Sequence, residues 1–391
     1  MATAGPTRTE LVSRATALIP VLRQRASRTE DLRRIPEDTL ADLHAAGLFR
    51  MLQPQRVGGS ELPYEAIVEL SAIIGRGCGS TAWVLANLAN HHWMLALWPR
   101  QAQEDLWGAS PDALIGSALM FPAGQAERCE GGFRLSGHWK FSSGIDACGW
   151  CMLGGITAGA DGELPEYRVF LVPQADYRVI DTWHVAGLRG TGSKDVEVHD
   201  IFVPGHRALA VRDMKGGIAP GGETAPLYRL PVFDLFPYVV AGAALGIAQG
   251  ALEVFSDDIR HRITAYSTTL LADYATTQSR LGHAAAAVAA AERILMGNCR
   301  EAMALAVEGV PAREHKIRLR RDGAYAAHLC TTAVDLLFGA GGGEFLYNQQ
   351  AIQRSFRDVH AANSHYALAW DMATTMAGKD LLGIAADLPT L

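Results

Sequence analysis

The sequence predicts a mostly α-helical protein with a small β domain at its centre. Residues 7 to about 115 show helical periodicity, residues 116 to about 225 hold short β-rich runs, and long Ala- and Leu-rich stretches fill the remainder. Because strands do not alternate with helices, a doubly wound sheet is excluded. We expect an N-terminal helical domain (1–115), an antiparallel β barrel or sandwich (116–225) and a C-terminal four-helix bundle (226–391).

The first region carries clear helix signals. The stretch "IPEDTLADLHAAGLF" has a proline at a first-turn position, early acids and apolar residues at helical spacing. The later stretch "TAWVLANLANHHWMLALW" is strongly apolar. Its helix is predicted to begin with Ser80 or Thr81 as the N-cap.

The middle region contains β-rich runs such as "FRLSGHWKFSSG", "EYRVFLVP" and "DVEVHDIFVP", separated by Gly, Pro and Asp. It also holds the CxxC pair of Cys148 and Cys151. A zinc site needs more ligands than this pair, and positions three apart on a strand face opposite ways. We therefore predict two small core side chains and no metal site.

We predict a helical bundle for the last region, because three of its stretches are rich in Ala and Leu and long enough to form one. The segment "GAGGGE" (339–344) follows one of these helical runs. A dinucleotide-binding fingerprint would follow a strand, so the segment is not interpreted as one.

Composition narrows the class of protein. The chain has 391 residues, 49% of them hydrophobic, and a formal net charge of -6 without a basic stripe, so no nucleic-acid partner is expected. The sequence contains no run of about 18 apolar residues, so we expect no membrane span. The first 20 residues do not resemble a signal peptide. Six cysteines are sparse for this length, which favours a reduced cytoplasmic protein.

Three stretches resemble the acyl-CoA dehydrogenase superfamily, in the same order along nearly the whole chain. "WKFSSG" (139–144) is similar to the family's strand that ends against the flavin ring. "GLRGTGSKDVEVHDIFVP" (187–204) is similar to its Gly-x-Arg-Gly-x-x-Ser/Thr loop, and 336–359 to its late glycine segment with Arg-Asp. The resemblance implies the same three-part fold and a homotetramer.

Departures from that family indicate the activity. The segment "RDVHAANSHYALAWD" has no glutamate where many acyl-CoA dehydrogenases place the base, and "GSALMFPAGQAE" replaces the Thr-Glu-Pro segment. Together with "NHHW" and "FSSG", these departures resemble the oxygenase components of two-component flavin-dependent monooxygenases, the 4-hydroxyphenylacetate hydroxylase-like branch. That resemblance implies a separate NAD(P)H:flavin reductase, reduced flavin (FMNH2 or FADH2), O2, a C4a-hydroperoxyflavin and an aromatic or polycyclic substrate.

The same resemblance assigns the candidate catalytic residues. Ser143 is expected near flavin N5, while His91 and His365 are the acid/base candidates, since histidine exchanges protons near neutrality. We favour His91 as the base that deprotonates a phenol and His365 on the peroxide side. His92 points about 100° away from His91 on the helix and is the weaker choice. The remaining candidates, His138, His184 and His360, are interpreted as structural or exposed.

The expected flavin-binding residues lie mainly in one loop. Trp183, Arg189, Gly190 and Ser193 belong to it, and the N–H groups of Gly190 and Gly192 are expected to approach an anion. A hairpin with glycines at positive φ is the structural alternative. Arg262, with Gln278, resembles positions that reach a neighbouring subunit's flavin, although a surface arginine is an equal alternative.

Other functions remain open at this point. Within the same scaffold they are an N- or S-oxygenase and an acyl-CoA dehydrogenase whose base lies elsewhere. An alternative from a different class is a non-catalytic helical scaffold that has lost flavin binding. The motifs at Ser143, Arg189 and His365 argue against it.

Overall fold

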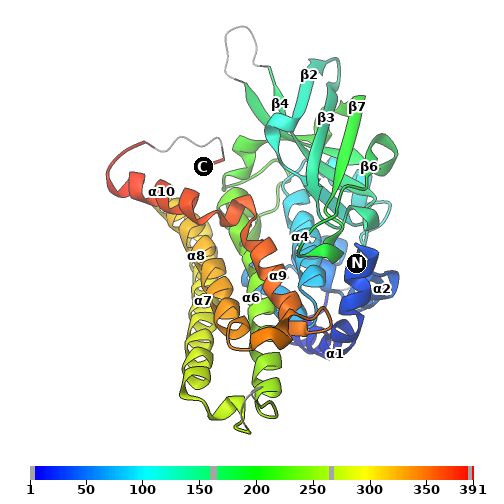
Figure 1. The fold of residues 1–391 in the computed structure, drawn as a ribbon. Helices are drawn as coiled ribbons and strands as arrows, with labels where there is room; N and C mark the ends of the chain where they lie inside the picture. Colours follow the sequence, from blue (N-terminus) through cyan, green and yellow to red (C-terminus); the bar gives the residue numbers. More distant parts are fainter. Residues whose placement is uncertain (1–4, 159–164, 264–267, 386–389) are drawn as a thin grey trace.

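The computed structural model describes residues 5–158, 165–263, 268–385 and 390–391. Helices come first along the chain, strands follow, and long helices end it (Figure 1). The strands lie at one end of the molecule, above the N-terminal helices, and the C-terminal helices lie beside the N-terminal ones (Figure 1). The predicted fold class is therefore confirmed.

Five helices form the first region. They are α1 (Arg8–Leu32), α2 (Glu37–Ala45), α3 (Glu65–Gly75), α4 (Gly79–Leu95) and α5 (Arg100–Trp107). The start of α4 differs from the prediction. The helix begins at Gly79 after Cys78, which makes no capping bond, and the hydroxyl of Ser80 accepts the N–H of Gly190 instead. The expected cap at Ser80 or Thr81 is therefore wrong.

The strands form one sheet. Its members are β1 (Ile115–Ala118), β2 (Gly124–Cys129), β3 (Gly132–Ser142), β4 (Trp150–Thr157), β5 (Glu166–Pro173), β6 (Arg178–Ile180), β7 (Lys194–Pro204) and β8 (Ala208–Ala210). Their order is β6-β7-β3-β2-β4-β5-β8, with β1 beside β4.

The sheet is mixed, whereas the sequence favoured antiparallel pairing throughout. β1 and β2 both pair with β4 in parallel, β1 along Trp150–Leu153 and β2 along Ile156–Thr157. The two short strands therefore follow each other along one edge of β4, joined by a 3-10 turn at Phe121–Ala123. The other pairings are antiparallel, as expected.

The last region contains α6 (Val232–Ile259), α7 (Ala275–Glu308), α8 (Arg313–Phe338), α9 (Ala351–Asn363) and α10 (Trp370–Leu381). Helices α6 to α9 pack against one another as the predicted bundle. By length and composition, α6 is apolar enough to cross a membrane, but 83% of that window is buried inside the protein. Helix α6 is therefore a core helix.

One hydrophobic core runs through all three regions. It includes Leu85 of α4, Trp139 of β3 and Val239 of α6, each completely buried. Helix α6 packs on α3 and α4 as well as on α7, α8 and α9. Because the core is shared, the division into three domains at 115 and 225 stays a prediction.

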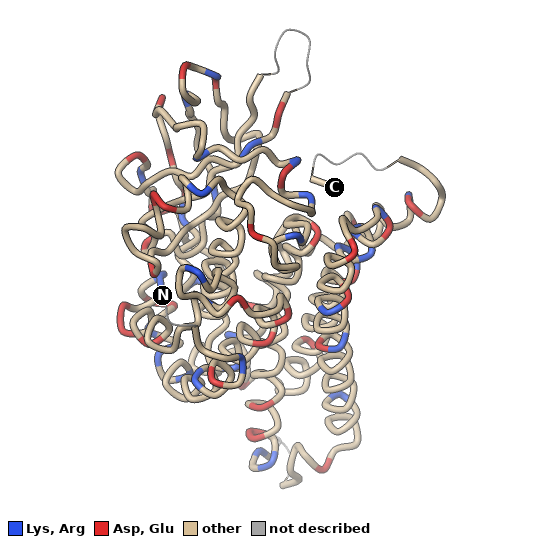
Figure 2. Tube along the Cα trace, turned by 180° about the vertical axis from the view of Figure 1, so that it is seen from behind, with Lys and Arg blue, Asp and Glu red and all other residues tan. Residues whose placement is uncertain are grey.

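The surface shows no segregation of charge over the described part of the chain. Lys and Arg are interspersed with Asp and Glu along the helices and the loops (Figure 2). Cys148 and Cys151 are both buried in the core. Among the described residues no group of three or more His, Cys, Asp or Glu side chains is placed to hold a metal.

Candidate functional site

The turn after β3 is unusual in its backbone. The pairing of β3 with β7 shifts between Trp139 and Ser142, and Phe141 in that bulge has a φ of 68°. A bulky residue in the left-handed region is strained, and such strain is concentrated at functional sites. Phe141 is also 58% exposed and meets the edge of Trp183 at 6.2 Å between ring centroids. Sequence reasoning missed Phe141, because only its backbone conformation distinguishes it.

Ser143 belongs to a line of polar contacts that runs from Trp83 to Leu188. Its hydroxyl accepts the indole N–H of Trp83 at 3.0 Å and lies 2.8 Å from the hydroxyl of Ser193. The Ser193 hydroxyl in turn lies 2.7 Å from that of Thr191, which donates to the carbonyl of Leu188 at 2.9 Å. The structure therefore brings together Ser143 and Ser193, which are 50 residues apart in the chain.

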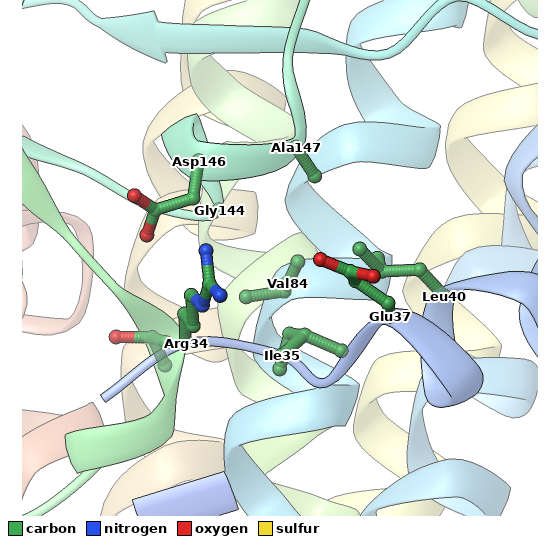
Figure 3. A pocket seen from close by; sticks show the side chains of 9 residues that line it. Arg34, Ile35, Glu37, Leu40, Val84, Gly144, Asp146 and Ala147 are labelled. Atoms are coloured by element: carbon green, nitrogen blue, oxygen red, sulfur yellow. The ribbon is translucent and has the colours of Figure 1, made fainter. Parts of the chain in front are cut away.

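The backbone joins the same two segments. The N–H of Gly144 donates to the carbonyl of Thr191 at 2.8 Å. Gly144 has a φ of 70°, and a Cβ there would lie 2.8 Å from Val84. A small cavity opens beside this turn, between α2, α4 and Thr191, and the Arg34 side chain reaches up toward Gly144 and Asp146 in it (Figure 3). Glycine is therefore needed for the turn to lie against α4.

The loop that holds Thr191 and Ser193 has one unpaired cation. Arg189 is half-buried, and its guanidinium makes no hydrogen bond or ion pair with any residue that the structure describes.

Trp183, the other candidate from this segment, is attached to the same loop. Its indole N–H donates to the carbonyl of Leu188 at 3.1 Å.

Gly190 does not behave as expected. Its N–H is donated to Ser80 on α4, so it does not approach an anion. A Cβ at this position would lie 2.4 Å from the Thr29 methyl group. Gly190 is required because the loop packs closely on α1, and we correct its predicted role accordingly.

An ionic network fixes the start of this loop. The carboxyl of Asp358 accepts the N–H of Leu188 at 2.6 Å, and Arg357 donates to the carbonyl of Ala186 and to Glu30, each at 2.7 Å. Burial raises the pKa of Asp358 to about 7, against the opposing effect of the Leu188 N–H. Residues of α1 and α9 thus hold the loop from two sides.

His365 lies next to Trp83, so it belongs to the same neighbourhood. The two ring centroids are 5.5 Å apart, and the ring centroid of Phe236 lies 5.6 Å from that of the imidazole. The N–H of Ala367 donates to His365 Nδ1 at 3.1 Å. Desolvation lowers the pKa of His365 to about 4, so the ring is neutral at pH 7. Because Nδ1 accepts, the proton of the neutral ring is on Nε2.

His91 has the opposite tautomer. Its Nδ1 lies 2.6 Å from the carbonyl oxygen of Ile115, which only accepts, so Nδ1 carries the proton. Its Nε2 is buried without a partner among the described residues. Desolvation lowers the pKa of His91 to about 4, opposed by the bond to Ile115. The ring stands two turns beyond Trp83 on α4, about 12 Å along the helix axis.

The other histidines have structural surroundings. His92 Nδ1 accepts the indole N–H of Trp107 at 3.1 Å, and desolvation lowers its pKa to about 3. His138 pairs with Asp195 and His360 with Asp335, while His184 lies 3.3 Å from the Arg33 guanidinium. All three are exposed.

Arg262 and Gln278 lie apart from this site within one chain. The Arg262 guanidinium pairs with Asp258 at 2.9 Å and lies 4.7 Å above the Phe345 ring, and Gln278 donates to the carbonyl of Ala272. These contacts are at the far end of the bundle, where α6 leads into α7 (Figure 1). The structure does not bring them to Ser143.

Comparisons with known proteins agree with this geometry. Residues 238–370 match the model of the acyl-CoA dehydrogenase C-terminal domain. The chain is 39% identical to the flavin-dependent monooxygenase oxygenase subunit HsaA of Rhodococcus jostii, over 95% of this chain and 98% of that one. It is 34% identical to the oxygenase component of an FADH2-dependent resorcinol hydroxylase from a Rhizobium species, over 96% and 94%.

A solved structure is similar over the whole length. XiaF from a Streptomyces species, in complex with FADH2 and glycerol, superposes with a TM-score of 0.90 at 30% identity, covering 98% of both chains. The chain therefore belongs to the oxygenase components of two-component flavin-dependent monooxygenases, which use reduced flavin from a separate reductase. Among the alternatives above, acyl-CoA dehydrogenase activity is not supported by these relatives.

Proposed function

We propose that this oxygenase component hydroxylates a phenolic substrate, with the flavin ring held at the Ser143 turn. The complementary tautomers of His91 and His365 carry this proposal, because one ring presents an acceptor nitrogen and the other a donor. A phenol must lose a proton to become a strong nucleophile, so it requires an acceptor. The relative named as a resorcinol hydroxylase supports a phenol as the substrate class.

The residues around the turn fit a flavin. Phe141 offers an exposed aromatic face, Ser143 is partly open to solvent, and Arg189 is a cation without a partner in the described chain. When bound, reduced flavin supplies the two electrons that activate O2. We infer FADH2 rather than FMNH2, since the resorcinol hydroxylase is named for FADH2 and XiaF holds it.

His91 takes the role of general base. Its Nε2 lone pair is free, and its Nδ1 proton is fixed by the Ile115 carbonyl, so the ring cannot rotate without losing a bond of 2.6 Å. With a pKa of about 4, the ring is unprotonated throughout the neutral range. Proton transfer from the phenol is then assisted by the same carbonyl, which stabilises the imidazolium through Nδ1–H.

His365 takes the role of proton donor on the oxygen side. The Ala367 N–H holds Nδ1, which leaves Nε2–H as the donor. The neighbouring rings of Trp83 and Phe236 shield part of the imidazole from water. Exclusion of water matters because stray protons divert reducing equivalents to hydrogen peroxide.

We further propose a homotetramer in the cytoplasm. The exposed apolar side chains of Leu346 and Tyr347 (68% and 56%) lie beside Phe345, over which Arg262 is placed. Such an exposed patch suits contact with another copy, whose flavin Arg262 and Gln278 would approach. All six cysteines are unpaired in the structure, which supports a reducing compartment.

The test combines the purified protein with a flavin reductase, NADH, FAD and a panel of phenols, anilines and thiophenes. We expect a hydroxylated product from phenols alone, and no NADH consumption when the reductase is omitted. The His91→Asn variant supplies the control, since N- and S-oxygenation use a lone pair and need no base. Product from anilines or thiophenes at wild-type rate in that variant would contradict the phenolic assignment.

A further inference from the structure

The line of hydroxyls from Trp83 to Leu188 has a fixed donor at one end and a fixed acceptor at the other. The Trp83 indole carries one N–H and accepts nothing, and it points at the Ser143 hydroxyl. The Leu188 carbonyl carries no proton and accepts the Thr191 hydroxyl. Between these ends lie three hydroxyl groups, each with one proton.

Counting protons gives the line one direction. Thr191 uses its proton on Leu188, so the 2.7 Å contact between Thr191 and Ser193 must use the Ser193 proton. The 2.8 Å contact between Ser193 and Ser143 must then use the proton of Ser143. If Thr191 instead donated to Ser193 and Ser193 to Ser143, the Ser143 proton would have no acceptor among the described residues. The Ser143 hydroxyl is thus left with one free lone pair and no free proton.

We propose that Thr191 and Ser193 are positioning residues that hold Ser143 as a hydrogen-bond acceptor and so make the site prefer reduced flavin. The proposal rests on the placement of flavin N5 at Ser143 proposed above. Reduced flavin carries a hydrogen on N5, which an acceptor pairs with. Oxidised flavin has a bare N5, which an acceptor leaves unpaired.

Burial supports this division of roles. Thr191 and Ser193 are 1% and 4% exposed, whereas Ser143 is partly open. We therefore infer that the two inner hydroxyls act without contacting the flavin, which for Ser193 differs from the direct flavin contact that the family resemblance implies, and that water does not compete for their protons. They act only through the orientation of the Ser143 hydroxyl.

Thr191→Val tests the proposal, because it keeps the shape of the side chain and removes the last hydroxyl. The Ser193 proton is then free to turn toward Ser143, and Ser143 is free to donate to a bare N5. We expect the ratio of oxidised to reduced FAD dissociation constants to fall by about ten-fold. The midpoint potential of bound FAD should fall by about 30 mV, which is that change for a two-electron couple.

Two matched variants accompany it. Thr191→Ser retains the hydroxyl and should keep the wild-type ratio. Thr331→Val removes a buried hydroxyl that bonds only within α8, and it should also leave the ratio unchanged. Ser193→Ala interrupts the line at another point and should reproduce the effect of Thr191→Val if that variant does not fold.

The outcomes separate this proposal from the one before it. An unchanged ratio in both Thr191→Val and Ser193→Ala, with a changed ratio in Ser143→Ala, would overturn the positioning role while Ser143 remains at the flavin. An unchanged ratio in Ser143→Ala as well would remove Ser143 from the flavin site altogether. A ratio that falls in Thr191→Val and is kept in Thr191→Ser would support the proposal.

Discussion

Helices α4 and α7 are both rich in apolar residues, yet they are used in opposite ways. Every residue of α4 is buried, including Ser80, Asn87, Asn90, His91 and His92. In α7 the buried residues form a single stripe, from Ala284 through Val288, Ala291 and Leu295 to Ala302, and the opposite face is open. The spacing of that stripe is the three-and-four pattern of a one-sided helix.

The difference shows where function is placed. A polar group on an enclosed helix has no water to satisfy it, so it either finds a partner or keeps a reactive atom unpaired. His91 does both, through Nδ1 and Nε2 respectively. The open side of α7 carries exposed small residues such as Ala286, and we propose this side as a contact surface for another copy.

The largest effect on product formation is expected for a substitution on the buried helix α4. His91→Asn should lower product formation about 100-fold at pH 7, because a positioned general base contributes roughly 10²–10⁴-fold. The loss should shrink near pH 10, where a phenol of pKa about 10 ionises without help. Product per flavin oxidised, measured from pH 6 to 10, checks this.

His92→Asn is the control on the same helix. The asparagine Oδ1 can take the place of Nδ1 as the acceptor of the Trp107 indole N–H, so the variant removes the rest of the ring, including Nε2, and retains this hydrogen bond. Product per flavin oxidised should stay at the wild-type value. His92 Nε2 also lacks a partner among the described residues, but it carries the ring proton. Equal catalytic losses in the two variants would mean that burial on α4, and not the free Nε2 lone pair of His91, decides the effect.

His365→Ala should act next most strongly, through coupling. Loss of one hydrogen bond to a developing charge corresponds to about ten-fold, so hydrogen peroxide released per flavin should rise about ten-fold. High pH should not restore coupling, because a proton donor has been lost. His365→Gln retains an N–H donor and should recover part of it. Rescue of the alanine variant at pH 10 would instead identify His365 as the base.

A smaller effect concerns stability in acid. Desolvation lowers the pKa of His91 to about 4, from an ordinary value of 6.5. Between these values the unfolded chain binds a proton that the folded chain does not, so stability is complete above pH 6.5 and falls as pH falls toward 4. At pH 5.5 this amounts to about 1 kcal/mol for His91. Urea unfolding of wild type and His91→Asn at pH 7.5 and 5.5 should show a smaller acid loss in the variant; equal losses would argue against a buried neutral ring.

The smallest effect on folding is expected on α7. Ala286→Glu lies on the exposed face and should change the free energy of unfolding by less than about 0.5 kcal/mol. It should nevertheless shift the assembly toward smaller species in sedimentation velocity. Ala41→Glu, at an exposed position of α2, is the matched control and should leave the assembly intact. A wild-type protein that sediments as a monomer would refute the role given to α7.

The fold was predictable because long stretches repeat one period. The apolar spacing within α6, α7 and α8 appears in the sequence without reference to any other part of the chain. The mixed pairing of the sheet was not predictable, because nothing in residues 115–129 shows that β1 and β2 share one edge of β4.

Site residues were predictable where they belong to a recognisable motif. They were not predictable where their role depends on a contact with a residue far away in the sequence. The motif resemblance selected Ser143 and Ser193, and they lie together. Ser80 looked like a helix cap because its true partner, Gly190, is 110 residues away. Phe141 looked like an ordinary strand residue, since its φ of 68° comes from the bulge opposite β7. The catalytic and cofactor roles of all these side chains stay predictions.

The ionic network at the start of the loop that holds Leu188, Thr191 and Ser193 has a consequence for the order of folding. Glu30 and Arg357 are separated by 327 residues, and Leu188 and Asp358 by 170. During synthesis, the N-terminal helices and the sheet leave the ribosome long before α9 does, so the loop lacks these anchors until the chain is nearly finished. Contacts between such distant positions also form slowly, because a long segment must be ordered to close them. We expect the ability to bind flavin to be among the last properties that the refolding protein regains, after its helices have formed.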